Sequence, residues 1–284
     1  MIFGLAAALG WGLADFSGAL AGRRIGSVSA VIVGQLLSAS FVSVLVVVTG
    51  QDLSRVVPLL GVVALNGAFA ATAYASHYRA LELGPVAVVS PIGAGFAVVG
   101  VGLTIVVLGE RPGPIELAGA CVTVLGVALV STDLVALRSG THTWAPGLAW
   151  AIVAAVTFGV GGFLLGYLAK ELGWILGLWA SRVAQIACFV PLALARRHEF
   201  RRIGTGGVAG ITLALAAGAA DILGVTTYSY GAESGLLSIV LAASAVFPLV
   251  AVVLSVWFLH ERPVTNQYVG IALVVVGLLL LGFG

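Results

Sequence analysis

Residues 109–130 read GERPGPIELAGACVTVLGVALV, and residues 260–281 read HERPVTNQYVGIALVVVGLLLL. Both stretches place a Glu-Arg-Pro motif before an apolar run that contains glycine, at an offset of 261 − 110 = 151 residues. The same offset matches Glu82 with Glu233, Gly84 with Gly235, Phe96 with Phe247, Gly119 with Gly270 and Gly126 with Gly277. Upstream, an offset of 147 matches Trp11-Gly12 with Phe158-Gly159, Phe16 with Phe163 and Gly26 with Gly173. The sequence therefore contains an internal repeat.

The composition excludes a soluble protein. Of the 284 residues, 61% are hydrophobic and 8% are charged, and the mean hydropathy is +1.17. Soluble domains carry about 25% charged residues, and 13 + 11 = 24 charges are too few to cover a globule of this length. A helix needs about 20 apolar residues to cross a bilayer, so the chain is long enough for many crossings.

Apolar runs separated by short polar breaks predict ten transmembrane helices. We expect them at Ile2–Ala21, Val28–Thr49, Val57–Leu81, Val86–Leu108, Ile115–Thr132, Gly147–Leu168, Trp174–Leu194, Val208–Tyr230, Leu236–Leu259 and Gln267–Phe283. The runs lack the period-two alternation of membrane-spanning strands. The predicted fold class is therefore an all-α membrane protein.

The repeat divides these ten helices into two groups of five. We expect the first repeat over residues 1–133, a connecting loop over 134–146 and the second repeat over 147–284. Because five is an odd number, the second repeat enters the membrane from the opposite side. Inverted repeats are typical of secondary transporters, which bind their substrate where the two halves meet.

Other classes of protein lack their sequence signatures. An enzyme would need a nucleophile or metal constellation, and none is visible; Cys121 and Cys188 both lie in apolar runs. We therefore expect no enzymatic activity, no metal and no cofactor. The net charge of +2 without a long basic run argues against nucleic acid. A sensor would usually need a soluble output domain, for which the loops are too short. A channel is the remaining alternative, but the paired interrupted helices and the repeat fit a carrier better.

The two five-helix repeats, each closing with GERP or HERP and a glycine-containing last helix, resemble the EamA family of the drug/metabolite transporter superfamily. The resemblance covers nearly the whole chain. It implies a multi-pass carrier of the prokaryotic inner (cytoplasmic) membrane that works by alternating access without ATP. Characterised relatives mostly export amino acids or other small metabolites. The resemblance fixes neither the substrate nor the oligomeric state.

Ionisable residues inside the predicted spans are candidate binding groups, because burying them in hydrocarbon is costly. Asp15 shares a helix face with Trp11 and could bind a proton or an amine, or it could form an interhelical hydrogen bond. His77 titrates near neutral pH if unperturbed, which makes it a candidate proton carrier. An interfacial hydrogen bond is the alternative for His77. Tyr78, its neighbour, belongs to the same candidate site.

Arg182 and Asp221 are expected to meet. At about 1.5 Å per residue, Arg182 lies about 12 Å from the Trp174 end of its span, and Asp221 about 14 Å from the Tyr230 end of its own. The pair could be a structural ion pair, or Arg182 could bind a substrate carboxylate. The matching positions in the first repeat are Gln35 and Ala70, so only the second repeat carries this pair.

Aromatic and helix-weakening residues complete the candidate site. Trp11, Phe96 and Phe247 are expected to form apolar walls, and Tyr228 is either a wall residue or part of an interfacial aromatic belt. Interruptions in the fourth and ninth spans predict hinges or gates, although close packing of small residues would also explain them. The hinge candidates are Pro91, Gly93, Gly95, Ser244 and Pro248.

The Glu-Arg-Pro carboxylates are expected to be structural. Glu110 and Glu261 each precede Arg and Pro just before a new helix. Capping of helix N-termini and a local ion pair would account for both.

The orientation in the membrane stays open. With the N-terminus inside, the inner loops would carry three basic residues and the outer loops nine. The positive-inside rule then favours both termini outside, whereas the family resemblance implies both in the cytoplasm. The choice decides between export and import.

The predicted function is secondary-active transport of a small metabolite, with an amino-acid exporter as the first reading. Exchange for protons is left open. The alternative is a proton-coupled exporter of lipophilic cations or drugs, which would need an intramembrane carboxylate and aromatic walls but no arginine. The expected partners are thus a small-molecule substrate, the lipid bilayer and, in the coupled case, protons.

Overall fold

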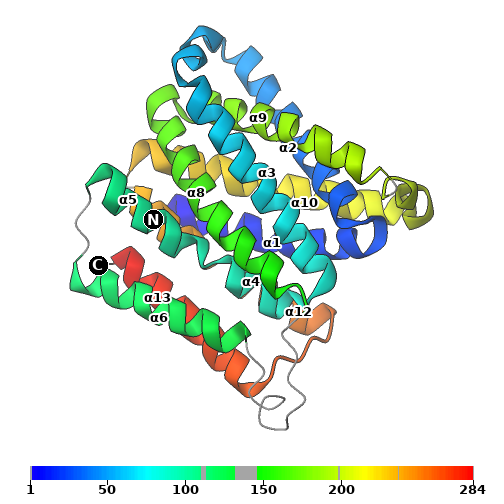
Figure 1. Ribbon diagram of the computed structural model, residues 1–284, viewed down its shortest axis with the longest axis vertical. Helices are drawn as coiled ribbons and strands as arrows, with labels where there is room; N and C mark the ends of the chain where they lie inside the picture. The colour runs from blue at the N-terminus through cyan, green and yellow to red at the C-terminus, as the bar shows by residue number, and fades with distance from the viewer. Residues whose placement is uncertain (1, 110–112, 132–145, 198, 236, 284) are drawn as a thin grey trace.

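The computed structural model describes residues 2–109, 113–131, 146–197, 199–235 and 237–283. This part of the chain is helical and contains no strand (Figure 1). Its helices are α1 (Ile2–Ile25), α2 (Ser27–Val48), the 3₁₀ helix η1 (Leu53–Leu59), α3 (Leu60–Leu83), α4 (Val86–Gly93), α5 (Phe96–Leu108), α6 (Pro114–Ser131), α8 (Leu148–Leu172), α9 (Trp174–Ala195), α10 (Arg201–Ser234), α11 (Leu237–Ser244), α12 (Pro248–Phe258) and α13 (Thr265–Phe283). The predicted all-α class is confirmed.

Seven helical stretches of the described residues are long and apolar enough to cross a membrane. They are α1, α2, Leu53–Leu83, Val86–Val107, α8, α9 and Gly207–Ser234. The shorter apolar helix α12 follows α11, and α6 and α13 close the two repeats. Each of the ten predicted spans therefore has its counterpart in the fold.

Four spans differ in detail from the prediction. The third begins with η1 at Leu53 instead of Val57, because the Asp52 carboxylate accepts a hydrogen bond of 2.9 Å from the Ser54 amide and caps that turn. Hydrogen bonds from Ser54 also lower the pKa of Asp52. The eighth span runs on to Ser234 and begins after a kink at Gly207, where φ is 66°. The fourth and ninth spans are each broken into two helices.

Two predicted features lie outside the described residues. The first Glu-Arg-Pro motif occupies residues 110–112, and the predicted connecting loop over 134–146 falls there except for Pro146. The second motif is described.

Glu261 caps a helix, but not the helix that follows it. Its carboxylate accepts hydrogen bonds from the amides of Val86 at 3.1 Å and Ala87 at 2.9 Å, at the N-terminus of α4 in the other repeat. Its ion pair is also long-range, with Arg23 at 3.3 Å, so the expected local pair is wrong. The start of α13 does not need Glu261, because the Gln267 side chain accepts from the Val264 amide at 3.1 Å.

Reciprocal contacts relate the two repeats by an approximate two-fold axis. A Cβ at Gly12 would lie 2.7 Å from the Phe247 carbonyl oxygen, and one at the matching Gly159 would lie 2.7 Å from that of Phe96. Phe96 and Phe247 also match each other, so the two contacts exchange under the repeat. This is the pattern of a self-complementary two-fold interface, and it agrees with inverted repeats.

The breaks in the fourth and ninth spans also match. Between α4 and α5 lie Ala94 and Gly95, and between α11 and α12 lie residues 245–247, at the offset 245 − 94 = 151. Hydrogen bonds of the 3₁₀ type occur in both turns, among them one from Gly95 to Ile92 at 3.0 Å and one from Phe247 to Ser244 at 3.3 Å. Of the hinge candidates, Gly93, Gly95, Ser244 and Pro248 border the breaks, and Pro91 lies inside α4.

The last helices of the two repeats, α6 and α13, lie side by side (Figure 1) and meet backbone to backbone. A Cβ at Gly126 would lie 2.6 Å from the Val274 amide nitrogen, and one at Gly277 would lie 2.5 Å from that of Thr123. Neither backbone can move aside without separating the helices, so glycine is required at both positions.

We expect Gly126→Ala and Gly277→Ala to destabilise the protein by about 1–3 kcal/mol each, as overpacking does. Gly102→Ala is the matched control, because nothing lies within 4 Å of a Cβ there. Midpoints of thermal unfolding in detergent compare the three variants. Equal midpoints for Gly126→Ala and Gly102→Ala would contradict the required close approach.

Candidate functional site

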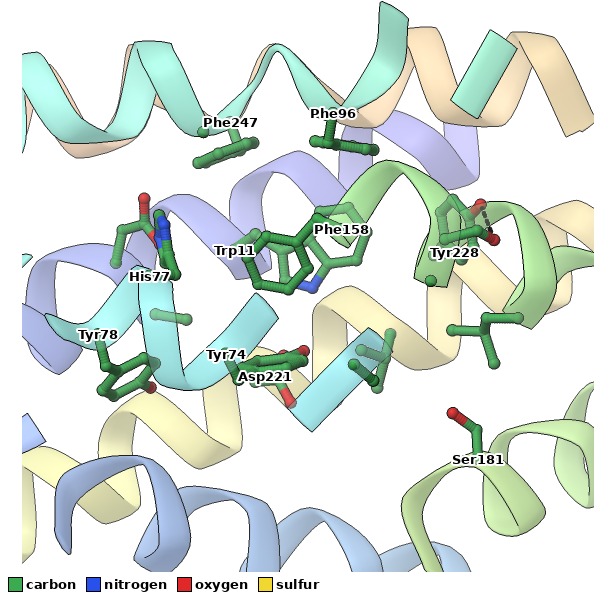
Figure 2. A pocket seen from close by; sticks show the side chains of 18 of the residues that line it. Trp11, Tyr74, His77, Tyr78, Phe96, Phe158, Ser181, Asp221, Tyr228 and Phe247 are labelled. Carbon is green, nitrogen blue, oxygen red and sulfur yellow. Dashed lines mark hydrogen bonds and ion pairs between the residues drawn. The ribbon is translucent and has the colours of Figure 1, made fainter. Parts of the chain in front are cut away.

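A cavity lies between the two repeats, and side chains from both line it (Figure 2). Its volume is about 90 Å³, well above the roughly 10–15 Å³ that one water molecule needs. Ten of the predicted residues line it: Trp11, Asp15, His77, Tyr78, Gly93, Phe96, Arg182, Asp221, Tyr228 and Phe247. The hinge candidates Pro91, Gly95, Ser244 and Pro248 are not among the lining residues.

The first polar cluster joins three helices of the first repeat. The Asp15 carboxylate of α1 lies 2.7 Å from Nε2 of His77 on α3, and it accepts a hydrogen bond from the Ser90 hydroxyl on α4. All three side chains are buried, with Ser90 fully so. A carboxylate and an imidazole in direct contact form a pair that can take up or release a proton.

The second polar cluster surrounds Arg182. Its guanidinium lies 2.8 Å from the Asp221 carboxylate, and both side chains are 3% exposed. It also donates to Gln35 at 2.5 Å, to Gln185 at 2.7 Å and to the Tyr74 hydroxyl at 3.2 Å. Two donors on Nη1 and two on Nη2 are thus engaged, which is four of the five that an arginine has.

Tyr74 and Gln35 complete the surroundings of Asp221. The Tyr74 hydroxyl donates to the Asp221 carboxylate at 2.6 Å, and the Gln35 amide donates to it at 3.2 Å. The buried ion pair therefore sits in a hydrogen-bond network that joins α2, α3, α9 and α10. Such a network compensates the cost of removing two charges from water.

Aromatic rings line the rest of the cavity. Figure 2 shows Phe96 and Phe247 along one side and Tyr74 and Asp221 along the opposite side. Trp11 contacts Phe96 edge to face, with ring centroids 6.0 Å apart. Phe158 of the second repeat contacts Tyr74 at 5.0 Å. The cavity is thus apolar with two polar clusters, as small-molecule sites are.

Three lining residues keep a buried nitrogen without a hydrogen-bond partner. These nitrogens are Trp11 Nε1, His77 Nδ1 and Arg182 Nε. Buried polar atoms are nearly always bonded, so a molecule in the cavity could bond these three. Trp11 and Arg182 carry donors only at these atoms. Four further buried atoms without a partner belong to Ser29, Ser38, Gln185 and Ser229, which do not line the cavity.

The site predicted from the sequence left out several lining residues. Asn66, Tyr74, Phe158 and Ser181 all contribute to the cavity, and Ser181 donates to Asn66 across the two repeats. The repeat itself carried a signal for one of them, because Phe158 matches Trp11. The residue type of Ser90 could not identify it as a partner of Asp15, because serine is common in membrane helices.

No group of three or more His, Cys, Asp or Glu side chains that could hold a metal occurs in the described part of the chain.

Comparisons with known proteins agree with this architecture. The EamA-like transporter family model matches residues 1–132 and 145–283, so the chain belongs to that family. Its members are membrane transporters of the drug/metabolite type.

Two further proteins resemble this chain. An uncharacterized protein of Methanocaldococcus jannaschii is 26% identical over 130 residues, which are 46% of this chain and 91% of that protein. Its match is thus about as long as one repeat. A crystal structure that is 21% identical superposes with a TM-score of 0.67 and covers 98% of this chain and 94% of its own. At that identity the likeness supports the fold alone.

Removing one partner of the Arg182–Asp221 pair should leave the other as an uncompensated buried charge. We expect Asp221→Ala to cost about 3–5 kcal/mol of stability. Arg182→Gln together with Asp221→Ala copies the residues at the matching positions, Gln35 and Ala70, and should recover part of that loss. Unfolding midpoints of the two singles and the double form a mutant cycle. Additive losses would show that the pair is not energetically coupled.

Proposed function

We propose that this protein is a secondary-active exporter of amino acids or closely related metabolites. It works by alternating access in the inner membrane of a prokaryote, in exchange for protons. The observation that supports this best is the composition of one cavity, which combines an arginine, two carboxylates and unpartnered donors. We infer that residues 1–133 and 147–284 are its two halves, joined by 134–146.

Arg182 and Trp11 suit a cargo that carries hydrogen-bond acceptors. Four donors of Arg182 are engaged, and its Nε–H remains without a partner, as does the indole N–H of Trp11. A carboxylate could accept from these two groups while the ion pair with Asp221 stays closed. Charge-assisted hydrogen bonds of this kind are about twice as strong as neutral ones.

Asp15 suits the opposite end of such a cargo. Asp221 is paired with Arg182, so its negative charge is neutralised. Asp15 is paired with His77, and when that imidazole is neutral the negative charge of Asp15 is available to the cargo. An ammonium group would then find its negative contact at Asp15. The same carboxylate can also take a proton, so cargo and proton have a common binding group.

The broken helices supply the means of alternation. Phe96 directly follows the break after α4, and Phe247 directly precedes α12; both rings line the cavity, 6.4 Å apart. Movement at either break would shift an aromatic side chain at the cavity without unfolding a helix. We therefore assign the breaks as hinges of the transport cycle.

A proton-coupled exporter of lipophilic cations is the second candidate. The aromatic lining and the Asp15 carboxylate favour it, since cations bind to aromatic faces and buried carboxylates. Such a cargo has no need of Arg182.

Counterflow in proteoliposomes should separate the two candidates. We expect a labelled amino-acid mixture to exchange in vesicles that contain the protein, and not in empty ones. In the Arg182→Gln/Asp221→Ala double variant this exchange should fall at least about tenfold, the effect of losing one charge-assisted contact.

Tetraphenylphosphonium is the competing cargo, and Gly102→Ala is the control variant. Uptake of tetraphenylphosphonium that survives the double substitution, together with absent amino-acid counterflow, would replace the first candidate by the second.

A further inference from the structure

The two repeats build the same small site in two chemical versions. At the repeat offsets, 15 + 147 = 162, 77 + 151 = 228 and 90 + 151 = 241, so Asp15, His77 and Ser90 match Gly162, Tyr228 and Leu241. In the first repeat the side chain from α3 contacts Asp15 on α1. In the second, the side chain from α10 donates to the Gly162 carbonyl on α8 at 2.9 Å.

The surroundings of the two sites match as well. Phe158 of the second repeat lies 5.5 Å from the His77 ring, and its counterpart Trp11 lies 5.5 Å from the Tyr228 ring. Leu241 occupies the position of Ser90, with a methyl 3.6 Å from where a Cβ on Gly162 would stand. The second site therefore reproduces the layout of the first with a phenol, a backbone carbonyl and a leucine.

We propose that the first repeat alone carries the proton-coupling site, with Ser90 as its positioning residue, and that each cycle exchanges one proton for one cargo molecule. The second repeat holds the neutral counterpart of that site. This inference rests on the proposed function of the same cavity.

Ser90 connects the titrating pair to a hinge. Its hydroxyl bonds Asp15 from α4, and Gly93, one turn further on, faces the His77 ring, since a Cβ there would lie 3.2 Å from Cε1. The break at Ala94 and Gly95 follows directly. A protonated carboxyl group is neutral, so proton uptake by Asp15 turns the charge-assisted bond from Ser90 into a weaker neutral one. The end of α4 therefore responds to the proton.

Other titratable and charged groups face the same cavity. They are Tyr74 and Tyr78 on α3, Arg182 on α9, and Asp221 and Tyr228 on α10. Arg182 and Asp221 neutralise each other, and tyrosines are neutral near pH 7. Among these lining residues, Asp15 and His77 remain as a buried acid–base pair in direct contact.

The second repeat supplies the sequence of an uncoupled variant. Asp15→Gly with His77→Tyr copies Gly162 and Tyr228, an arrangement that this fold already accommodates. We expect accumulation driven by a pH gradient to be lost in this variant. Counterflow of the labelled amino-acid mixture should also fall, because Asp15 contacts the ammonium group of the cargo, so the hydrogen-exchange experiment below separates the loss of the proton site from the loss of cargo binding. Asp15→Asn, which keeps the size of the side chain, should give the same result if the double variant does not fold.

The accumulation itself measures the stoichiometry. With the membrane voltage clamped at zero, a gradient of about one pH unit supports about tenfold accumulation for one proton and about a hundredfold for two. Tenfold accumulation in the native protein, abolished in the double variant, supports the proposal. Hundredfold accumulation, or accumulation that survives the double substitution, overturns it. Counterflow without any gradient-driven accumulation would overturn the coupling and leave the carrier function standing.

Hydrogen exchange tests the proposal without any cargo. Between about pH 5 and about pH 8, after correction for intrinsic rates, protection of Val86–Leu108 should change in the native protein and stay constant in the double variant. The matching segment Leu237–Phe258 is the internal control and should not respond. Equal responses of both segments, or none in the first, would refute the assignment even if no amino acid is transported.

Discussion

Hydrocarbon offers no hydrogen-bond partner, so polar groups in a spanning helix are stable only where the protein or a molecule bound to it supplies one. This constraint explains the arrangement of the core more fully than any single contact. Arg182, with four engaged donors, draws side chains from α2, α3, α9 and α10 around itself. Asp15 draws α3 and α4 toward α1 in the same way. The cavity lies where these two sets of bonds leave the apolar packing incomplete.

The two repeats share their backbone contacts and helix breaks but differ in the polar side chains that line the cavity. The backbone contacts at glycines and the two helix breaks repeat faithfully between the halves, because they fix how helices approach and bend. The polar side chains in the cavity do not repeat. The repeat matches Arg182 with Gln35, and it matches Asp15 with Gly162. A symmetric frame thus holds an asymmetric lining, which suits a molecule whose two ends differ.

Sequence reasoning predicted the frame well because the frame depends on composition and spacing. Apolar runs define the ten spans, and the recurrence of Glu-Arg-Pro and of glycine at fixed offsets defines the repeat. Helical rise alone was enough to bring Arg182 and Asp221 to the same depth, and they do form an ion pair. The partners of these groups were harder to predict. Whether Ser90 faces Asp15 or lipid depends on the rotation of α4, and the sequence of an almost uniformly apolar helix does not specify its rotation. Glu261 was assigned a local role for the same reason, since spacing along the chain does not reveal a contact with a distant turn.

The long sequence separation between Glu261 and the helix that it caps affects the order in which the helices are completed during synthesis. Its bond to the Ala87 amide closes a loop of 174 residues, so the first turn of α4 is synthesised and inserted long before its cap exists. Until the ribosome has delivered α12 and the turn after it, two amide groups at the start of α4 must rely on water or lipid headgroups. The fourth helix therefore gains this cap only after α12 has been made. Completion of the second half thus completes a helix end in the first, and a chain that stopped before Glu261 would leave that end open.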